Sequence, residues 1–226
     1  QDSLYVLSDA DYYGIVEVEI TAADGYLASL DTMQIVLTNT NDAPYMAASA
    51  PDIVLNEDFG TWTYGNAGTY FADIDNALTY GVEVLSAGVN AAVFGDTIKL
   101  YSTARFYGTS QIRLFATDGQ FTISDTMAVQ INNVNNTPYV AASVPDTTIL
   151  EDFGYTWIRT LSPYFQDYDN ATLTFAATAL TPGVSVETGH DTLYIQSQSD
   201  FFGSVAIKLS ASDGEYTTTD TMAITI

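Results

Sequence analysis

Acidic residues recur at matching points of a repeated sequence, and this recurrence is the feature of the chain most able to do chemistry. An Asp-Gly step occurs three times at intervals of about 94 residues, and an Asp-x-Asp-Asn step occurs twice, about 94 residues apart. Carboxylates held close together repel one another unless a cation lies among them. The recurring positions are Asp24, Asp118 and Asp213 in the first step, and Asp73, Asp75, Asp167 and Asp169 in the second.

Calcium is the cation that such a set of side chains favours. Ca²⁺ binds about six to eight oxygen ligands, drawn from carboxylates, amides and backbone carbonyls, in a flexible geometry. Mg²⁺ requires a tighter octahedron and keeps several waters, so it fits a cage of many carboxylates less well. The sequence therefore predicts Ca²⁺ wherever the fold brings these loops together.

Turn formation is the alternative role for the same residues. Asp and Asn side chains accept hydrogen bonds from loop backbones, and an Asp-Gly pair is also a hairpin signal. Both roles can coexist in one carboxylate. A third recurring carboxylate precedes each Thr-Met step, and we expect it to start the last strand of each repeat through a local backbone hydrogen bond. Its positions are Asp31, Asp125 and Asp220.

The repeat divides the chain into modules of about 94 residues. We expect the C-terminal half of a module at 1–43 (module one), a complete module at 44–137 (module two) and another at 138–226 (module three). Strict alternation of apolar and polar residues predicts antiparallel strands, about seven in a complete module. The predicted fold is all-β, a tandem array of Greek-key sandwiches.

The topology of a seven-strand sandwich predicts where the acidic loops lie. The loops after the second and sixth strands lie at the same end as the entering chain. We therefore expect Asn41, Asp42, Asp73, Asp75 and Asp118 to converge at the junction of modules one and two.

Module one supplies only later strands, beginning with a short one predicted around Leu4 and Val6. Half a sandwich exposes an apolar face and an open edge. We expect either a longer chain or a neighbouring chain to supply the missing strands.

Charge excludes several classes of partner. The chain has 28 Asp and Glu against 5 Lys and Arg, a formal charge of −23. Binding to nucleic acid needs a basic surface, so we expect none, and anionic membrane surfaces are disfavoured for the same reason. No run of 18 apolar residues and no signal-peptide pattern at Gln1 is present, and there is no cysteine.

Catalytic motifs are lacking, so we expect no enzyme. His190 is the single histidine. It has no recurring partner, and no G-x-S-x-G nucleophile motif occurs in the chain. Trp62 and Trp157 are expected in the cores rather than on sugar-binding surfaces. The 16 tyrosines could form an exposed patch for a ligand or for a polymer contact.

The combined motifs resemble the cadherin-like, Ig-like tandem repeats of prokaryotic surface proteins and adhesins. The similarity rests on the Asn-Asp-Ala-Pro linker, the Asn-Glu-Asp after the first strand, the Asp-x-Asp before Leu-Thr-Tyr, and the Asp-Gly turn. It implies Ca²⁺ between successive modules. The resemblance assigns ligand roles to Asn41, Asp42, Asp73, Asp75 and Asp118, and it directs Glu57 toward module three.

The second junction departs from this pattern. Its linker is Asn135-Asn136-Thr137-Pro138, with Asn136 where the first linker has Asp42, and Arg105 occupies a position that is acidic in module one. We predict that the first junction binds Ca²⁺ more tightly. The second binds one ion or replaces one with an Arg105 ion pair. Its ligand candidates are Glu57, Asn136, Asp167, Asp169 and Asp213.

The function implied is mechanical: a non-catalytic, calcium-stiffened segment of a long secreted or cell-surface protein involved in adhesion, in a stalk or in a filament. Its expected partners are adjacent repeats of the same chain. Two alternatives remain open. One is a filament subunit, in which another copy adds strands to module one. The other is an accessory module that binds glycans.

Overall fold

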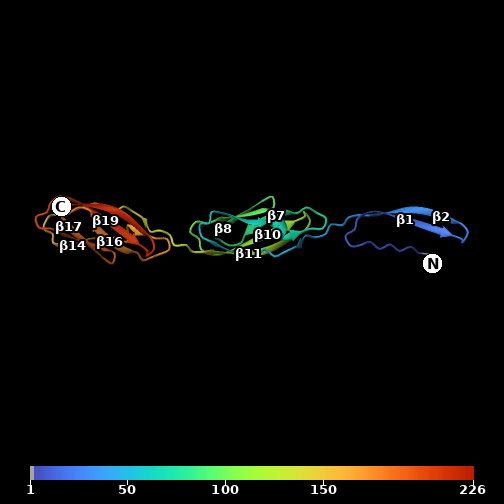
Figure 1. The fold of residues 1–226 in the computed structure, drawn as a ribbon, viewed down its shortest axis with the longest axis horizontal. Coiled ribbons are helices and arrows are strands. Elements are labelled where there is room, and N and C mark those ends of the chain that lie inside the picture. Colours follow the sequence, from blue (N-terminus) through green and yellow to red (C-terminus); the bar gives the residue numbers. More distant parts are fainter. Residues whose placement is uncertain (1–2) are drawn as a thin grey trace. The chain divides into compact units, whose positions relative to one another are not determined.

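The computed structural model describes residues 3–226, and strands make up almost all of its regular structure (Figure 1). Within that range there is one short 3₁₀ helix, η1 (Ala67–Thr69), and no helix long and apolar enough to cross a membrane. The chain forms two compact units, one extending to Asn133 and the other from Val134 to Ile226.

Module two is a sandwich of two main sheets. The first has the order β4-β11-β10-β7, with β4 parallel to β11 and the other pairs antiparallel. The second has the order β5-β9-β8. The short strands β3 and β6 form a separate antiparallel pair. The strands are β3 (Tyr45–Met46), β4 (Ile53–Asn56), β5 (Thr61–Asn66), β6 (Phe71–Ala72), β7 (Thr79–Val84), β8 (Val89–Phe94), β9 (Thr97–Ser102), β10 (Gly108–Thr117) and β11 (Thr122–Asn132).

Module three repeats this topology strand for strand. Its sheets have the orders β13-β20-β19-β16, β14-β18-β17 and β12-β15, and β13 again runs parallel to the last strand. The predicted all-β sandwich is confirmed. The strands are β12 (Tyr139–Val140), β13 (Thr147–Thr148), β14 (Tyr155–Thr160), β15 (Phe165–Gln166), β16 (Thr174–Ala179), β17 (Val184–Gly189), β18 (Thr192–Ser197), β19 (Ser204–Ser212) and β20 (Thr217–Thr225).

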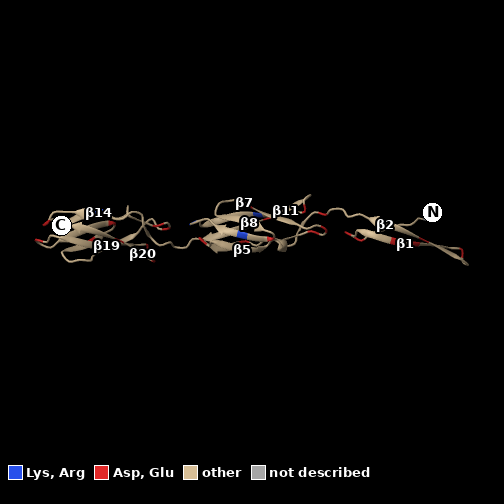
Figure 2. Ribbon diagram, turned by 90° about the horizontal axis from the view of Figure 1, so that it is seen from above, with Lys and Arg blue, Asp and Glu red and all other residues tan. Residues whose placement is uncertain are grey.

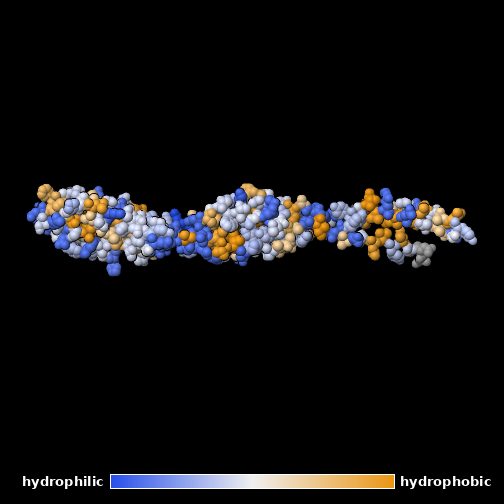
Figure 3. Space-filling view, viewed as in Figure 1, coloured by the Kyte–Doolittle hydropathy of each residue, from blue (hydrophilic) through white to orange (hydrophobic). Residues whose placement is uncertain are grey.

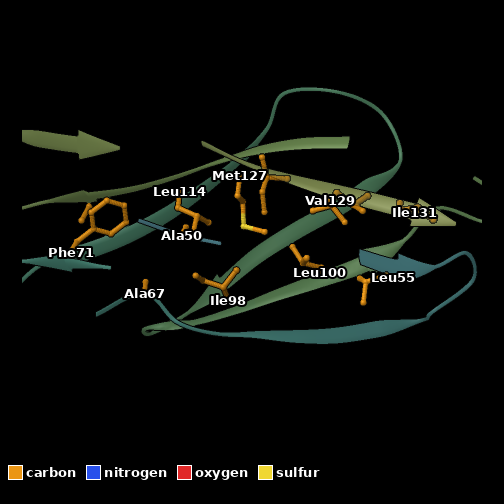
Figure 4. Packing of buried hydrophobic residues seen from close by; sticks show 13 residues of the cluster. Ala50, Leu55, Ala67, Phe71, Ile98, Leu100, Leu114, Met127, Val129 and Ile131 are labelled. Carbon is orange, nitrogen blue, oxygen red and sulfur yellow. The ribbon is translucent and has the colours of Figure 1, made fainter. Parts of the chain in front are cut away.

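The core of module two follows from the alternation in its strands. Ile112 and Leu114 of β10 point inward from the first sheet, and Ile98 and Leu100 of β9 meet them from the second, all 0–1% exposed. In Figure 4, Leu114, Met127 and Val129 of the first sheet face Ile98 and Leu100 of the second. The residues between them in β10, such as Arg113, point outward, and Arg113 forms an ion pair with Glu83.

Module one is a hairpin of β1 (Gly14–Ala23) and β2 (Ala28–Leu37), equivalent to β10 and β11. The strand predicted around Leu4 and Val6 is wrong, because residues 3–13 contain no strand. No described strand lies beside them to satisfy an extended backbone. Hydrophobic surface is visible over this part of the molecule in Figure 3. Met33 is 40% exposed, whereas its equivalents in modules two and three, Met127 and Met222, are each 1% exposed.

The prediction that both tryptophans lie in the cores is wrong. Trp62 is 46% exposed and Trp157 is 58% exposed. Trp157 pairs across the sheet with Tyr194, and the neighbours of Tyr194 along β18, Leu193 and Ile195, take the inward positions. Alternation along the strands therefore places Trp157 on the outer face of its sheet.

The recurring aspartate before each Thr-Met step lies inside the last strand rather than at its start, which corrects the sequence prediction. The expected local bond is present: Asp125 Oδ1 accepts from the Thr126 amide at 2.8 Å. Its Oδ2 accepts from the Ala50 amide at 2.8 Å and from Ser49 Oγ at 3.0 Å. This aspartate therefore ties the segment between β3 and β4 to β11.

We expect Asp125→Ala to destabilise module two by about 1–3 kcal/mol, because it leaves the amide of the buried residue Ala50 without its acceptor. Asp31→Ala is the matched control, since among the described residues its carboxylate accepts only from the adjacent Thr32 amide. Urea unfolding of both variants measures the difference. Equal losses in the two variants would contradict the proposed role of Oδ2.

Candidate functional site

Asp118 uses its two carboxylate oxygens for different partners. Oδ1 accepts from the Phe121 and Gln120 amides at 2.6 and 2.7 Å and closes the turn between β10 and β11. Oδ2 accepts from Asn41 Nδ2 in the linker at 2.9 Å. The Phe121 bond is the main cause that lowers the pKa of Asp118, and the Asn41 bond adds to it. One side chain therefore both closes the turn through Oδ1 and contacts the linker through Oδ2.

Asp73 shows the same division, but its second oxygen has no partner. Oδ1 accepts from the Asn76 and Asp75 amides at 2.7 and 3.0 Å, which fixes the loop between β6 and β7. Oδ2 is buried and accepts no hydrogen bond from any described residue. Burying a carboxylate oxygen without a partner lowers the stability of the fold, so this atom is a candidate ligand for a cation.

Amides of the linker and the loop surround these carboxylates. Asn39 Nδ2 donates to Asp75 Oδ2 at 2.7 Å, and this bond is the largest cause of a lowered pKa for Asp75. Asn76 Nδ2 donates to Asp75 Oδ1 at 3.1 Å and also to Asn41 Oδ1. Asn41 therefore joins the Asp118 turn to the Asp73 loop.

Asp42 experiences the repulsion that the sequence predicts. Partial burial raises its pKa, and the carboxylates of Asp11, Asp75 and Asp73 raise it further. Each of these groups disfavours the ionised form of Asp42. The structure thus brings together the linker and both acidic loops of module two, as the topology predicted. Whether these residues bind a metal stays a prediction.

The equivalent loops of module three have the same arrangement. Asp167 Oδ1 accepts from the Asp169 and Asn170 amides, both at 2.8 Å, and Asp167 Oδ2 is buried with no hydrogen-bond partner in the described range. Asp213 Oδ1 accepts from Tyr216 and Glu215 amides at 2.6 and 2.7 Å. Burial acts to raise the pKa of Asp213, but these backbone bonds outweigh it and the pKa is lowered.

The second linker donates hydrogen bonds where the first linker carries a charge. Asn136 donates to Asp169 Oδ2 from its backbone amide at 2.6 Å and from Nδ2 at 2.9 Å. Asn135 Nδ2 donates to Asp213 Oδ2 at 2.9 Å, as Asn41 does to Asp118. Asn136 therefore donates hydrogen bonds to a carboxylate at the position where Asp42 of the first linker adds repulsion.

Glu57 lies just after β4 and is only 6% exposed. Its amide donates to the carbonyl of Asn132 at 2.9 Å. Glu57 is therefore not solvated at this strand end. Its predicted metal role toward module three stays a prediction, as does the Arg105 ion pair.

Carboxylates alone do not form a metal cage. Within residues 3–226, no three His, Cys, Asp or Glu side chains lie close enough together to hold an ion. Amides separate the carboxylates, so an ion at these loops would also need amide or carbonyl oxygens. Acidic residues, red in Figure 2, lie in many of the loops, whereas Lys and Arg are few. His190 lies exposed in the turn between β17 and β18.

The sequence reasoning missed Asn39 and Asn76 of this site, and it noted Asp11 only as the acidic counterpart of Arg105. Asn39 and Asn76 had a usable signal, because Asn133 and Asn170 repeat them at the same interval. Asp11 gave only a weak signal, since Arg105 replaces it in module two.

Comparison with known proteins supports the fold. No family model matches the chain, and no curated protein matches it. The mouse protocadherin-24 EC1-3 structure matches with a TM-score of 0.53 and 14% identity, covering 96% of this chain and 81% of that one. Human protocadherin-24 EC1-2 matches with a TM-score of 0.51 and 14% identity, covering 82% and 98%. The modules therefore have a cadherin-like β-sandwich fold.

An enzyme structure also matches over much of the chain. The endo-fucoidan hydrolase MfFcnA4 from glycoside hydrolase family 107 gives a TM-score of 0.38 at 14% identity, covering 95% of this chain. The chain spans about a third of the length of that structure, 34%.

Proposed function

We propose that this chain is a non-catalytic structural segment of a long extracellular surface protein, stiffened by Ca²⁺ where successive modules join. One observation carries the proposal. Asp73 and Asp167, at equivalent positions of modules two and three, each have a buried Oδ2 atom without a hydrogen-bond partner in the described range. Cadherin-like fold and adhesin-like linker motifs support a place in a cell-surface protein of the prokaryotic adhesin kind.

At the first junction, Asp42, Asp73, Asp75 and Asp118 would supply carboxylate oxygens and Asn41 an amide oxygen. Because no three carboxylates of residues 3–226 lie close enough together to hold an ion, these loops would have to close around it. These are the hard oxygen ligands that Ca²⁺ prefers. A bound Ca²⁺ supplies positive charge that removes the repulsion raising the pKa of Asp42. The linker, already tied to both loops through Asn41, would then lose bending freedom.

At the second linker, Asp167, Asp169 and Asp213 would be the carboxylate ligands, with Asn136 in place of Asp42. Ligand charge sets calcium affinity, so this set binds more weakly than the first. Without an ion at either junction, the carboxylates repel and the linker bends.

Small-angle scattering with and without a chelator tests the mechanical role. We expect EDTA to change the radius of gyration and to broaden the distribution of intramolecular distances, because the linkers gain bending freedom. Restoring excess Ca²⁺ should reverse both changes, whereas excess Mg²⁺ should reverse them incompletely. Identical scattering curves with and without Ca²⁺ would contradict the proposal.

A second candidate function is a filament subunit completed by strand addition. It is favoured by the exposed inner face of the β1-β2 hairpin, whose counterparts in modules two and three are buried. The forward scattering intensity in the same experiment reports the particle mass. A mass that grows with protein concentration, with or without Ca²⁺, supports strand addition, and a monomer mass throughout counts against it.

A further inference from the structure

The outer face of the β14-β18-β17 sheet in module three carries an aromatic surface that the proposed calcium role does not use. Leu193 and Ile195 of β18 point into the core, so Tyr194 and Gln196 point outward. Trp157 lies opposite Tyr194 on one side, and Glu187 lies opposite it on the other. Trp157, Tyr194 and Glu187 thus form one row across three strands.

Tyr155 completes the surface and holds its rings in place. Tyr155, in β14, lies opposite Gln196 of β18. Its ring stacks on that of Tyr194, with the ring centroids 5.3 Å apart and an angle of 7° between the planes. Its hydroxyl donates to Glu187 Oε1, on the far strand of the sheet. Stacking and this hydrogen bond both restrict the ring, so a ligand would meet a surface that is already ordered.

A glycine makes room for the inner ring. Gly189 lies on β17, and a Cβ there would come within 3.2 Å of the Tyr194 ring. Tyr194 therefore lies close against the β17 backbone on one side and against Tyr155 on the other. Tyr155 and Trp157 remain 55% and 58% exposed. We call Tyr155, Trp157 and Tyr194 the aromatic platform.

Module two shows that the fold does not need these aromatic residues. Its equivalent strands pair in the same register, Thr63 opposite Lys99, as Trp157 lies opposite Tyr194. The positions of Tyr155, Trp157 and Tyr194 are occupied there by Thr61, Thr63 and Lys99. Exposed aromatic area that a neighbouring repeat omits is therefore available for binding.

The polar groups around the aromatic platform indicate its ligand. Glu187 and Gln196 supply hydrogen-bonding groups at its edge, and a hollow of about 90 Å³ lies among Tyr155, Glu187, Tyr194 and Gln196. One water occupies roughly 30 Å³, so this hollow fits a hydroxymethyl group rather than a whole ring. The negative faces of aromatic rings attract the positively polarised C–H bonds of a flat sugar face.

Size and charge exclude the other occupants. An aromatic side chain buries roughly 150–250 Å², so two half-exposed rings and the less exposed Tyr194 provide much less than the roughly 800 Å² that each partner buries in a stable protein interface. The chain's charge of −23 and Glu187 itself disfavour polyanions. We propose that the aromatic platform of module three binds neutral polysaccharide.

Affinity electrophoresis of the full 226-residue chain tests this proposal. The gels contain neutral polysaccharides (β-glucan, xylan, galactomannan and starch) or a polyanion (alginate) as separate probes. We expect retardation by at least one neutral polysaccharide and none by alginate. The triple variant Tyr155→Thr, Trp157→Thr, Tyr194→Lys, which has the residue types of module two, should bind at least tenfold more weakly.

Controls separate loss of the aromatic platform from loss of folding or of calcium. Tyr107→Ala removes a tyrosine of similar exposure, 57%, from module two and should leave retardation unchanged. Thermal unfolding checks that the triple variant is folded. EDTA should not alter retardation, so the test is independent of the proposed calcium role. No retardation by any neutral probe, retardation by alginate alone, or equal retardation of the triple variant would overturn the proposal.

Discussion

We expect Asp73→Asn to remove most of the stabilisation that Ca²⁺ gives to module two. The amide oxygen of the substituted side chain can still accept the hydrogen bonds from the Asp75 and Asn76 amides, so the loop should keep its shape. What the variant loses is the buried, unpartnered Oδ2 and its charge. Loss of an outer-shell partner at a metal site costs about 10- to 100-fold in affinity. We expect loss of a direct ligand to cost at least as much, measured by calorimetric titration.

The same variant should behave differently without calcium. Removing the charge at position 73 relieves part of the repulsion on Asp42, so the calcium-free variant should be at least as stable as the parent chain. Asp96→Asn is the matched control, because Asp96 accepts from Asn66 Nδ2 and Thr97 Oγ1, away from the linker contacts. If Asp73→Asn retained the full calcium-induced rise in Tm, Oδ2 of Asp73 would not be a ligand.

Exchanging one linker residue between the junctions should reverse their calcium affinities. Asn136→Asp adds a carboxylate beside Asp169 and replaces the Nδ2 donor at 2.9 Å with an acceptor. Without calcium, module three should therefore become less stable, and its stabilisation by calcium should grow. Asp42→Asn should have the opposite effect at the first junction, because it removes the carboxylate that faces Asp73 and Asp75.

Titration of the two single variants and of the double exchange measures these effects. We expect about a tenfold change in affinity, or about 1.4 kcal/mol, at each altered junction, since ligand charge tunes calcium affinity. Glu83→Gln serves as the control, because it removes a charge from a surface ion pair in module two. Equal affinities at both junctions in the unaltered chain would contradict the predicted ranking.

The repeat predicted the fold and the meeting point of the acidic loops. Alternating apolar residues define strands such as β10, and the number of strands per repeat determines which loops share an end. The proximity of Asn41 to Asp118 agrees with that topology, whereas their hydrogen bond was not predicted. Local signals and the repeat agree at these positions, which is why sequence reasoning succeeded there.

Other features depend on contacts that no sequence pattern specifies. The segment around Leu4 and Val6 alternates like a strand, but a strand also needs a hydrogen-bonding neighbour. Trp157 is hydrophobic, yet the register of β14 against β18 places it outside the core. Asp73 Oδ1 accepts backbone hydrogen bonds while Oδ2 is buried without a partner in the described range, and this difference depends on loop geometry that the sequence does not specify.

A crystal structure of the chain grown with millimolar calcium tests the central claim most directly. Anomalous scattering at long wavelength identifies calcium, and chelator-treated crystals provide the control. The account predicts an anomalous peak within bonding distance, roughly 2.3–2.6 Å, of Asp73 Oδ2, and a weaker one at Asp167 Oδ2. Well-ordered loops with no peak at either oxygen would contradict it.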